Sequence, residues 1–162
     1  MVLGVVCPHG HHNHPDARFC SVCGTALTEQ HASVLISGPR PPLGVLVIDD
    51  GATLAIDRDV LIGREPHGES EVLAGAAEPL ALTDANNSVS RRHARIVLDE
   101  WRVLASDLGS SNGTWLNRGP DPLSWIEIGS DEQVELHAGD RLRVGSRLVQ
   151  VELHHSGANQ RM

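Results

Sequence analysis

From Gly44 onward the chain is divided into short apolar segments that are separated by turn sequences. These segments lie at 45–49, 53–56, 60–64, 80–83, 93–98, 101–106, 141–144 and 147–153. Between them stand turn signals such as DDG, GSSNG, AGD and GS. Period-two patterning of this kind is typical of antiparallel strands, and no 11-residue segment has helical periodicity. The pattern therefore predicts an all-β sandwich or barrel.

Residues 65–79 form a longer interval between two of these segments. Gly75 and Pro79 bracket its apolar stretch, which has room for one helical turn, and we expect a long loop here instead of a helix. Connections in compact domains usually have ~4–6 residues, and longer loops often serve function.

The charge of the chain argues against nucleic acid as a partner. Thirteen basic and twenty-one acidic residues give a net charge of −8, which opposes binding to a phosphate backbone through the global field. With one Phe, three Trp and no Tyr, a stacking platform for single strands is also poorly supplied. Any anion site must therefore be local.

The opening residues, MVLGVVC, lack the basic region and the apolar length of a signal peptide. No later segment approaches the ~18 apolar residues of a membrane span. All three cysteines lie within the first 23 residues, in a pattern typical of a metal site in a reducing compartment. We expect a soluble, cytoplasmic protein without a membrane span.

One group of polar residues is suited to bind an anion. SRRH at 90–93 offers hydroxyl and guanidinium donors, and GSSNG at 109–113 adds Asn112 and backbone amides in a turn whose glycines permit close approach to a ligand. Arginine matches phosphate through two parallel hydrogen bonds, so Arg64 and Arg91 are the expected principal charges. An all-β scaffold places such segments on loops at one end of the sandwich.

Ser90 and His93 also invite a catalytic interpretation, which we reject. A nucleophile and base need an orienting carboxylate and an oxyanion hole, and no G-x-S-x-G elbow surrounds this pair. We predict that the protein is not an enzyme. Nearby, Arg92 and Arg95 are expected on solvated strand faces, and Asp107 is expected to cap a turn. Packing in the core or at sheet edges is expected for Trp101, Trp115 and Trp125.

Four blocks of the chain resemble the forkhead-associated (FHA) family. They are IGRE (62–65), VSRRHARI (89–96), DLGSSNGTWLN (107–117) and GDRLRVG (139–145), in the family's order and spacing. The resemblance implies an eleven-stranded antiparallel β-sandwich whose loop end binds phosphothreonine in a partner protein. The implied role is an adaptor in Ser/Thr kinase signalling, with a kinase or its substrate as the phosphorylated partner.

The resemblance also implies roles for individual residues. Arg64, Ser90 and Arg91 match positions that contact the phosphopeptide, Ser111 matches one that often helps to hold the phosphate, and Asn112 matches the asparagine that holds the peptide main chain. Positions that support the site without touching ligand are matched by Gly63, His93, Gly113 and Thr114. Peptide preference beyond the phosphothreonine falls to the loop at 83–89, whose residues do not identify a preferred side chain.

The N-terminal segment CPHGHHNHPDARFCSVCG resembles a zinc ribbon with one ligand changed. Cys20 and Cys23 form a C-x₂-C knuckle, whereas Cys7 lacks such a partner because Gly10 stands in its place. His11 is the natural substitute and gives Cys₃His, an accepted tetrahedral set for structural zinc. The rivals for the fourth position are His9, His12 and His14. A metal-free polar arm is the alternative, and a closed zinc site would serve as a docking module.

Four regions follow from these patterns. We expect a zinc-ribbon-like module at 1–28, a Gly/Pro-containing linker at 29–43, the forkhead-associated domain at 44–154 and a flexible tail at 155–162.

Two other functions compete with phosphothreonine reading. A structural assembly protein could use the same fold without phosphate, although it would not need intact anion-binding residues. A nucleic-acid-binding zinc protein needs a basic face, and HGHHNH supplies histidines that are neutral near pH 7. A phosphorylated threonine in the N-terminal segment could also occupy the protein's own phosphothreonine site. Only Thr25 and Thr28 could have this role, and they do not form a TT pair.

Overall fold

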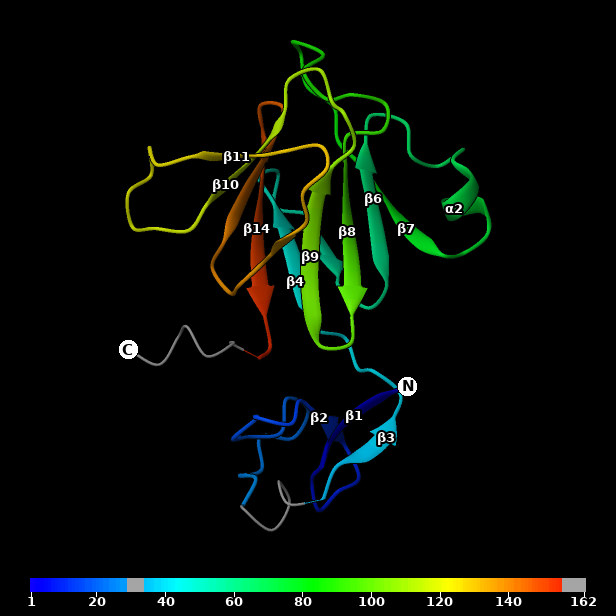
Figure 1. The fold of residues 1–162 in the computed structure, drawn as a ribbon, viewed down its shortest axis with the longest axis vertical. Helices are drawn as coiled ribbons and strands as arrows, with labels where there is room; N and C mark the ends of the chain where they lie inside the picture. The colour runs from blue at the N-terminus through cyan, green and yellow to red at the C-terminus, as the bar shows by residue number, and fades with distance from the viewer. Residues whose placement is uncertain (29–33, 156–162) are drawn as a thin grey trace.

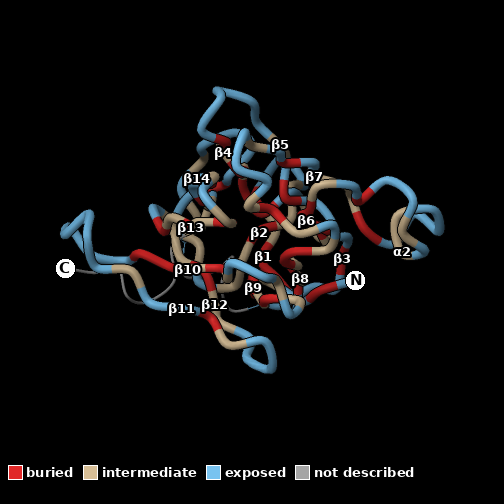
Figure 2. The backbone as a smooth tube through the Cα atoms, turned by 90° about the horizontal axis from the view of Figure 1, so that it is seen from above, coloured by how far each residue is buried: buried red, intermediate tan, exposed pale blue. Residues whose placement is uncertain are grey.

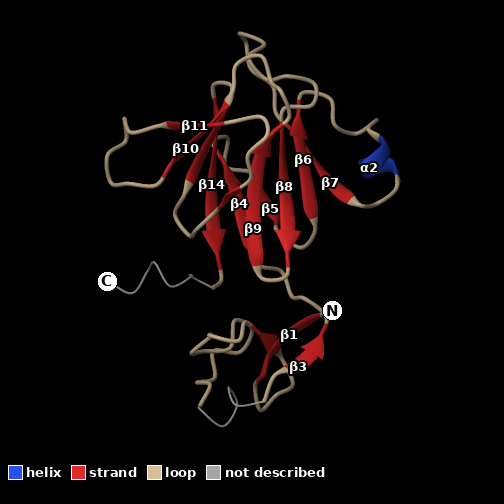
Figure 3. Cartoon of the chain, viewed as in Figure 1, coloured by secondary structure: helices blue, strands red, loops and turns tan. Residues whose placement is uncertain are grey.

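The structure is a computed structural model that describes residues 1–28 and 34–155. It contains a β-sandwich and a small N-terminal sheet, which lies beyond one end of the sandwich in Figure 1. The predicted all-β fold is confirmed, since the described residues form strands and a single one-turn helix (Figure 3). No helix in this part of the chain has the length and apolar character needed to cross a membrane.

The sandwich is built from eleven strands in the described residues. Their bounds are β4 Gly44–Ile48, β5 Thr53–Ala55, β6 Asp59–Gly63, β7 Ala77–Ala81, β8 Ala94–Asp99, β9 Arg102–Asp107, β10 Thr114–Asn117, β11 Ile126–Ile128, β12 Val134–Glu135, β13 Arg141–Val144 and β14 Arg147–Leu153. A six-stranded sheet has the order β11-β10-β13-β14-β4-β5, and a five-stranded sheet has the order β12-β9-β8-β6-β7.

The core lies between these two sheets and follows the period-two pattern. Along β4 and β13, buried residues alternate with half-buried ones, which is why the sequence pattern identified these strands. Figure 2 shows the buried segments concentrated in the strands and the exposed segments in the loops. Fully buried core side chains include Leu46, Ile62, Ile96, Leu142 and Val149.

Two features of the sandwich differ from the prediction. β6 and β7 pair in parallel, with Gly63 opposite Ala81, so the sandwich is not antiparallel throughout. The connection between them contains the one-turn helix α2 (Ser70–Leu73), where a continuous loop was expected. Pro79, expected to bracket that loop, lies inside β7, and because β7 is an edge strand the missing proline N–H is tolerated.

The expectation that Arg92 and Arg95 are simply solvated is wrong. Arg92 contacts Glu69 at 2.8 Å and also pairs with Glu71, while Arg95 lies 3.5 Å from Asp59 and 3.6 Å from Glu71. The hydrogen bond from Arg92 holds the pKa of the Glu71 carboxyl below its usual value. These pairs attach the α2 connection to the segment that leads into β8 and to β8 itself.

The N-terminal sheet has β1 (Val2–Val6) between β2 (His12–Asn13) and β3 (Ile36–Gly38), and both pairings are antiparallel. β3 belongs to the segment expected to be a linker, so part of that segment completes the N-terminal sheet instead. Residues 29–33 of the expected linker and 156–162 of the expected tail lie outside the described residues.

The turn between β8 and β9 contacts the N-terminal sheet. Trp101 Nε1 donates a hydrogen bond to the carbonyl oxygen of Leu3 at 2.8 Å, and its ring lies edge-on to His12 and His14 at 5.6 and 5.5 Å between centroids. Trp101 was expected to pack in the core or at a sheet edge, and it packs between the sandwich and the N-terminal sheet. Because β8 and β9 turn at this end, their other ends reach the opposite pole of the sandwich, away from the N-terminal sheet (Figure 1).

Candidate functional site

Three neighbouring strands bring the segments that were predicted to bind an anion to one end of the sandwich. β6 ends at Gly63, β8 begins at Ala94, and β9 ends at Asp107, and these strands are adjacent in the five-stranded sheet. In antiparallel neighbours the end of one strand lies beside the start of the next. The segments that follow β6, precede β8 and follow β9 therefore lie together, far from the N-terminal sheet in Figure 1.

Gly63 allows two of these segments to touch. A Cβ atom at this position would lie 2.0 Å from the carbonyl oxygen of Arg91, a distance that no side chain tolerates. The backbone N–H of Arg64 donates to the carbonyl oxygen of Ser90 at 2.9 Å. The absence of a side chain thus sets the spacing between the end of β6 and the segment that carries the serine.

The Arg64 side chain lies over the loop at 87–89. One guanidinium nitrogen donates to Asn87 Oδ1 at 3.1 Å and to the carbonyl oxygen of Val89 at 3.3 Å. Arg91 is more exposed, and its guanidinium lies 3.8 Å from the carboxylate of Glu65. Both partners of this ion pair are about two-thirds exposed, so water screens it strongly.

His93 connects two loops from a fully buried position. Its Nδ1 accepts the backbone N–H of Ser90 at 3.0 Å, and its Nε2 lies 2.8 Å from the carbonyl oxygen of Gly113. Because Nδ1 is an acceptor, the ring proton is on Nε2, which donates to that carbonyl. The ring binds the backbone of Ser90 and not its hydroxyl, so the arrangement is a brace and not a nucleophile with its base.

The turn at 109–113 lies against residues 88–90. The backbone N–H of Ser111 donates to Ser90 Oγ at 3.0 Å, and Asn112 Nδ2 donates to the carbonyl oxygen of Ser88 at 2.9 Å. Gly113 has φ +84°, which glycine adopts without strain. The five residues implied to bind phosphopeptide are thus assembled on loops at one end: Arg64, Ser90, Arg91, Ser111 and Asn112.

Asp107 caps this turn, as expected from the sequence. Its carboxylate accepts the backbone N–H groups of Gly109 and Ser110 at 2.9 and 3.0 Å, the Ser110 hydroxyl, and Thr114 Oγ1 at 2.7 Å. Burial opposes ionisation of this carboxyl, but the hydrogen bonds outweigh it and hold the pKa below its usual value. Thr114 is fully buried and supports the turn from inside. A polar depression of about 310 Å³ lies beside the turn.

Sequence reasoning missed a second carboxylate near the site. Asp84 accepts the backbone N–H of Ser88 at 2.7 Å and the hydroxyls of Ser88 and Ser146. The Ser146 hydroxyl, followed by Ser88, lowers the pKa of Asp84 to about 2. This group ties the loop at 83–89 to the turn between β13 and β14. Because Ser146 is 62 residues from Asp84, no local pattern could have indicated the contact.

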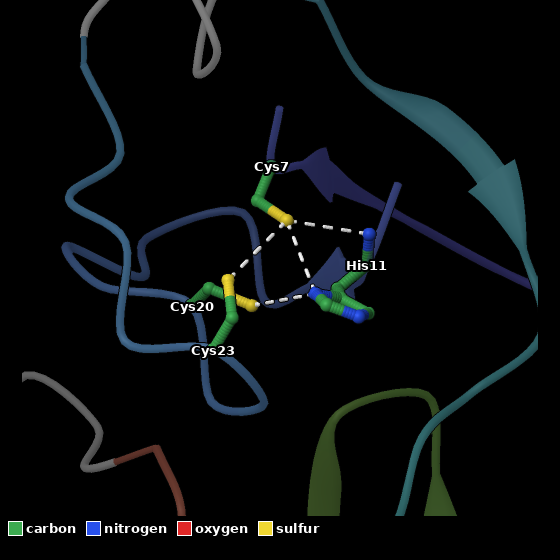
Figure 4. Close-up of side chains that lie close together, drawn as sticks. All are labelled: Cys7, His11, Cys20 and Cys23. Atoms are coloured by element: carbon green, nitrogen blue, oxygen red, sulfur yellow. Dashed lines mark hydrogen bonds between the residues drawn. The ribbon is translucent and has the colours of Figure 1, made fainter. Parts of the chain in front are cut away.

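A separate cluster in the N-terminal sheet could hold a metal ion. The ligand atoms of Cys7, His11, Cys20 and Cys23 all lie within 4.8 Å of one another (Figure 4). Cys7 Sγ lies 3.9 Å from Cys23 Sγ and 3.3 Å from His11 Nδ1, and Cys20 Sγ lies 3.5 Å from His11 Nδ1. Zinc bonds of about 2.3 Å to sulfur and 2.0 Å to nitrogen separate tetrahedral ligand atoms by about 3.5–3.8 Å. The four residues therefore fit a zinc ion.

The surroundings of this cluster act differently on its thiols and distinguish the histidines. Burial raises the pKa of the Cys7 thiol, although backbone N–H groups of His9 and His11 point at Cys7 Sγ, each at 3.3 Å, whereas the Thr25 hydroxyl lowers the pKa of the Cys23 thiol to about 5. His9 Nδ1 lies 3.5 Å from Cys23 Sγ, so it borders the cluster. The rings of two other rivals pack on Trp101 instead, namely His12 and His14.

Fold and site together define a β-sandwich that gathers arginine, serine and asparagine side chains on loops at one pole. The model of the FHA domain family matches residues 60–145, a little more than half of the chain, and the protein belongs to this family. Members of the family are generally binding modules rather than enzymes. No curated protein sequence matches the chain.

Solved structures of FHA domains are similar to this chain. The FHA domain of an Arabidopsis thaliana hypothetical protein is 26% identical with a TM-score of 0.55, and the match covers 76% of this chain and 95% of that one. A structure from an analysis of phosphothreonine-dependent FHA domain interactions is 28% identical with a TM-score of 0.50, covering 70% and 98%. The FHA domain of CT664 from Chlamydia trachomatis, at 24% identity and a TM-score of 0.51 over 68% and 96%, supports the fold.

Proposed function

We propose that this protein is an adaptor that binds phosphothreonine in a partner protein. The observation that carries the proposal is the contact between the two donor loops, in which Ser111 N–H meets Ser90 Oγ and Asn112 reaches the backbone of Ser88. This contact holds the turn that carries Ser111 and Asn112 against the segment that carries Ser90. A structure similar to this chain comes from work on phosphothreonine-dependent FHA interactions, which supports the same ligand.

The chemistry of the ligand follows from these donors. A phosphate monoester carries nearly two negative charges and three acceptor oxygens near pH 7. Arg64 and Arg91 supply charge, Ser90 and Ser111 supply hydroxyl groups, and Asn112 is placed to hold the peptide main chain. Supporting positions are occupied by Gly63, His93, Gly113 and Thr114. The site has no activated nucleophile, and we infer that the protein binds its partner without chemical change.

The partner we propose is a Ser/Thr kinase or one of its phosphorylated substrates, met in the cytoplasm. Residues 44–154 would act as the binding domain. The acidic chain disfavours nucleic acid as a competing ligand.

We further propose that the N-terminal cluster holds one structural zinc ion. Cys7, His11, Cys20 and Cys23 would be its ligands, and four protein ligands close the site to substrates. Trp101 of the sandwich contacts the same small sheet. When folded, residues 1–28 would give the protein a second docking surface beside the phosphopeptide site. Zinc would supply the folding free energy that so small a core lacks.

The decisive experiment measures peptide binding by two arginine variants. Arg64 follows the end of β6 and Arg58 precedes its start, so Arg64→Ala and Arg58→Ala remove the same group at opposite ends of one strand. We expect a phosphothreonine peptide library to bind wild type and Arg58→Ala, and Arg64→Ala to bind about 10- to 100-fold more weakly. Phosphatase treatment of the peptides should abolish binding.

Partner capture that is equal before and after phosphatase treatment would overturn the proposal. That result would favour a structural assembly protein that uses the same fold without phosphate.

A further inference from the structure

Tryptophan and arginine side chains alternate on the outer face of the six-stranded sheet. Trp115 and Arg143 are register partners on β10 and β13, and the Arg143 guanidinium carbon lies 5.1 Å from the Trp115 ring centre and 5.2 Å from that of Trp125. The Arg141 guanidinium carbon lies 5.8 Å from the centre of the Trp125 ring. We call this row of Trp115, Arg143, Trp125 and Arg141 the tryptophan–arginine ladder. All four residues are half-buried. Trp115, Arg141 and Arg143 alternate with buried residues along β10 and β13, so they face away from the core, and Trp125 lies against both arginines just before β11.

The ladder begins at the phosphopeptide site. Trp115 Nε1 donates to the backbone carbonyl of Asn112 at 3.3 Å, so the first indole touches the residue proposed to hold the peptide main chain. At its far end Arg141 donates to Asn117 Oδ1 at 3.0 Å. Arg143 and Arg141 lie opposite Trp115 and Asn117, three and five residues along the chain from Asn112. With about 3.3 Å per strand residue, these arginines lie about 10–17 Å from Asn112, a span of three to five residues of extended peptide.

The arginines of the ladder differ from most other arginines of the chain because no carboxylate in the described part of the chain pairs with them. The chain has no lysine, and most described arginines lie within 4.0 Å of a carboxylate, namely Arg58, Arg91, Arg92, Arg95, Arg102, Arg118 and Arg147. Within residues 1–28 and 34–155, no carboxylate pairs with Arg141 or Arg143. The same holds for Arg64 at the phosphopeptide site, and for Arg18 and Arg40 near the N-terminal sheet.

We propose that the tryptophan–arginine ladder binds an acidic segment of the phosphorylated partner, next to its phosphothreonine. Stacking on an indole uses the face of a guanidinium and leaves its N–H edge for carboxylates. In a chain with net charge −8, arginines without carboxylate partners are where an anion is attracted and not repelled. The inference rests on the proposed function, because it places the acidic segment by its distance from the phosphothreonine.

One carboxylate on this face limits where the acidic segment fits. Glu127 of β11 lies directly opposite Trp115 in the pairing of β11 with β10, on the side of Trp115 away from Arg143. It repels a partner carboxylate at the start of the ladder. The acidic side chains therefore fit beyond Trp115, beside Arg143 and Arg141.

Binding measurements with three peptides test the proposal. The first carries phosphothreonine between neutral residues, the second adds four glutamates three to six positions away on either side, and the third is the second without phosphate. We expect the second to bind about fivefold more tightly than the first. The double variant Arg141→Gln/Arg143→Gln should remove this difference, whereas Arg102→Gln on the opposite sheet should keep it. Equal affinities of the first two peptides for wild type would overturn the inference.

Indole N–H signals in NMR spectra of unmodified protein give a second test, which does not depend on the folding of a variant. The third peptide should shift the signals of Trp115 and Trp125 and leave that of Trp101 at the opposite end unchanged. If no phosphopeptide binds but these signals still shift, the proposed phosphothreonine binding is wrong, and binding of an acidic segment to the tryptophan–arginine ladder is still supported. If a single-stranded oligonucleotide shifts them at lower concentration than the peptide, the assignment to an acidic protein segment is wrong.

Discussion

His93 Nε2 lies 2.8 Å from the carbonyl oxygen of Gly113, and through this bond the imidazole joins two loops that are 20 residues apart in sequence. The other ring nitrogen holds the backbone N–H of Ser90. One buried side chain therefore sets the positions of the serine and of the turn that carries Asn112. A change at His93 should affect the fold and the ligand site together.

We predict that His93→Phe lowers the free energy of unfolding by about 2–3 kcal/mol. Phenylalanine fills the space but leaves the Ser90 N–H without its acceptor, and the Gly113 carbonyl keeps only the longer bond from the Gly145 N–H, at 3.4 Å. Urea denaturation measures the loss, and phosphopeptide affinity should fall with it. His67→Phe, at an exposed position, is the control. A free energy of unfolding for His93→Phe within 0.5 kcal/mol of wild type, on the order of a neutral surface change, would contradict this role.

Gly63→Ala should destabilise the protein by about 1–3 kcal/mol, as overpacking does elsewhere. The added methyl would lie 2.0 Å from the backbone of Arg91, so the end of β6 and the segment at 90–91 must separate. Gly68→Ala is a matched control, because no heavy atom lies within 4 Å of its Cβ position. Thermal unfolding of the two variants tests this prediction, and equal melting temperatures would exclude the close approach that we describe.

Local pattern was enough for the main strands and insufficient for the features made by distant contacts. The alternation in β4 and β13 is visible because one face is buried and the other is not. β12, with two residues, is too short to show a period. A strand was expected at 80–83, but its parallel pairing with β6 was not. The helix α2 was also missed, and its contacts with Arg92 come from about 20 residues away, where no local pattern records them.

In the candidate site too, local contacts could be predicted from the sequence and contacts between distant residues could not. Asp107 and the turn after it could be predicted, since an aspartate that caps the backbone N–H groups two and three residues further on is a local arrangement. Asp84 and Ser146 could not, because only the folded sandwich places them together. The tryptophans were assigned to packing in the sequence, which does not show that Trp115 reaches Asn112.

Glu65→Gln should strengthen phosphopeptide binding by about twofold. Glu65 lies 3.8 Å from the Arg91 guanidinium and competes with the phosphate for it, and exposed pairs of this kind contribute about 0.2–1 kcal/mol. Fluorescence anisotropy at low salt measures the change. Glu100→Gln, in the turn at the opposite end, alters the net charge equally and should have no effect. Weaker binding by Glu65→Gln would show that Arg91 does not face the phosphate.

The contribution of Asp84 to stability should disappear in acid. Hydrogen bonds from Ser146 and Ser88 lower its pKa to about 2 from 3.8. A carboxyl with a depressed folded pKa stabilises the fold above its unfolded pKa, and that stability is lost as the pH falls through the folded value. The difference in unfolding free energy between wild type and Asp84→Asn should therefore shrink between about pH 4 and pH 2.

Urea denaturation of both proteins across this range provides the measurement. Ser146→Ala should raise the lower end of this window, because it removes the hydroxyl that lowers the folded pKa most. A difference between wild type and Asp84→Asn that is constant with pH would contradict the contact.

Replacing single histidines should identify the fourth zinc ligand. His11 Nδ1 lies 3.3 Å from Cys7 Sγ and 3.5 Å from Cys20 Sγ, whereas His9 Nδ1 approaches Cys23 Sγ alone, at 3.5 Å. We expect wild type and His9→Ala to contain about one zinc ion per chain by elemental analysis, and His11→Ala to lose it at a much lower chelator concentration.

Tryptophan fluorescence reports the consequence of zinc removal for the sandwich. Trp101 packs against the N-terminal sheet, so a chelator should change the emission of wild type but not that of Trp101→Phe. Phosphopeptide binding should survive chelation, because the donor loops lie at the opposite pole from this sheet. Zinc retention by His11→Ala together with loss from His9→Ala would reverse the ligand assignment, and wild-type protein purified without zinc would leave the N-terminal segment as a metal-free arm.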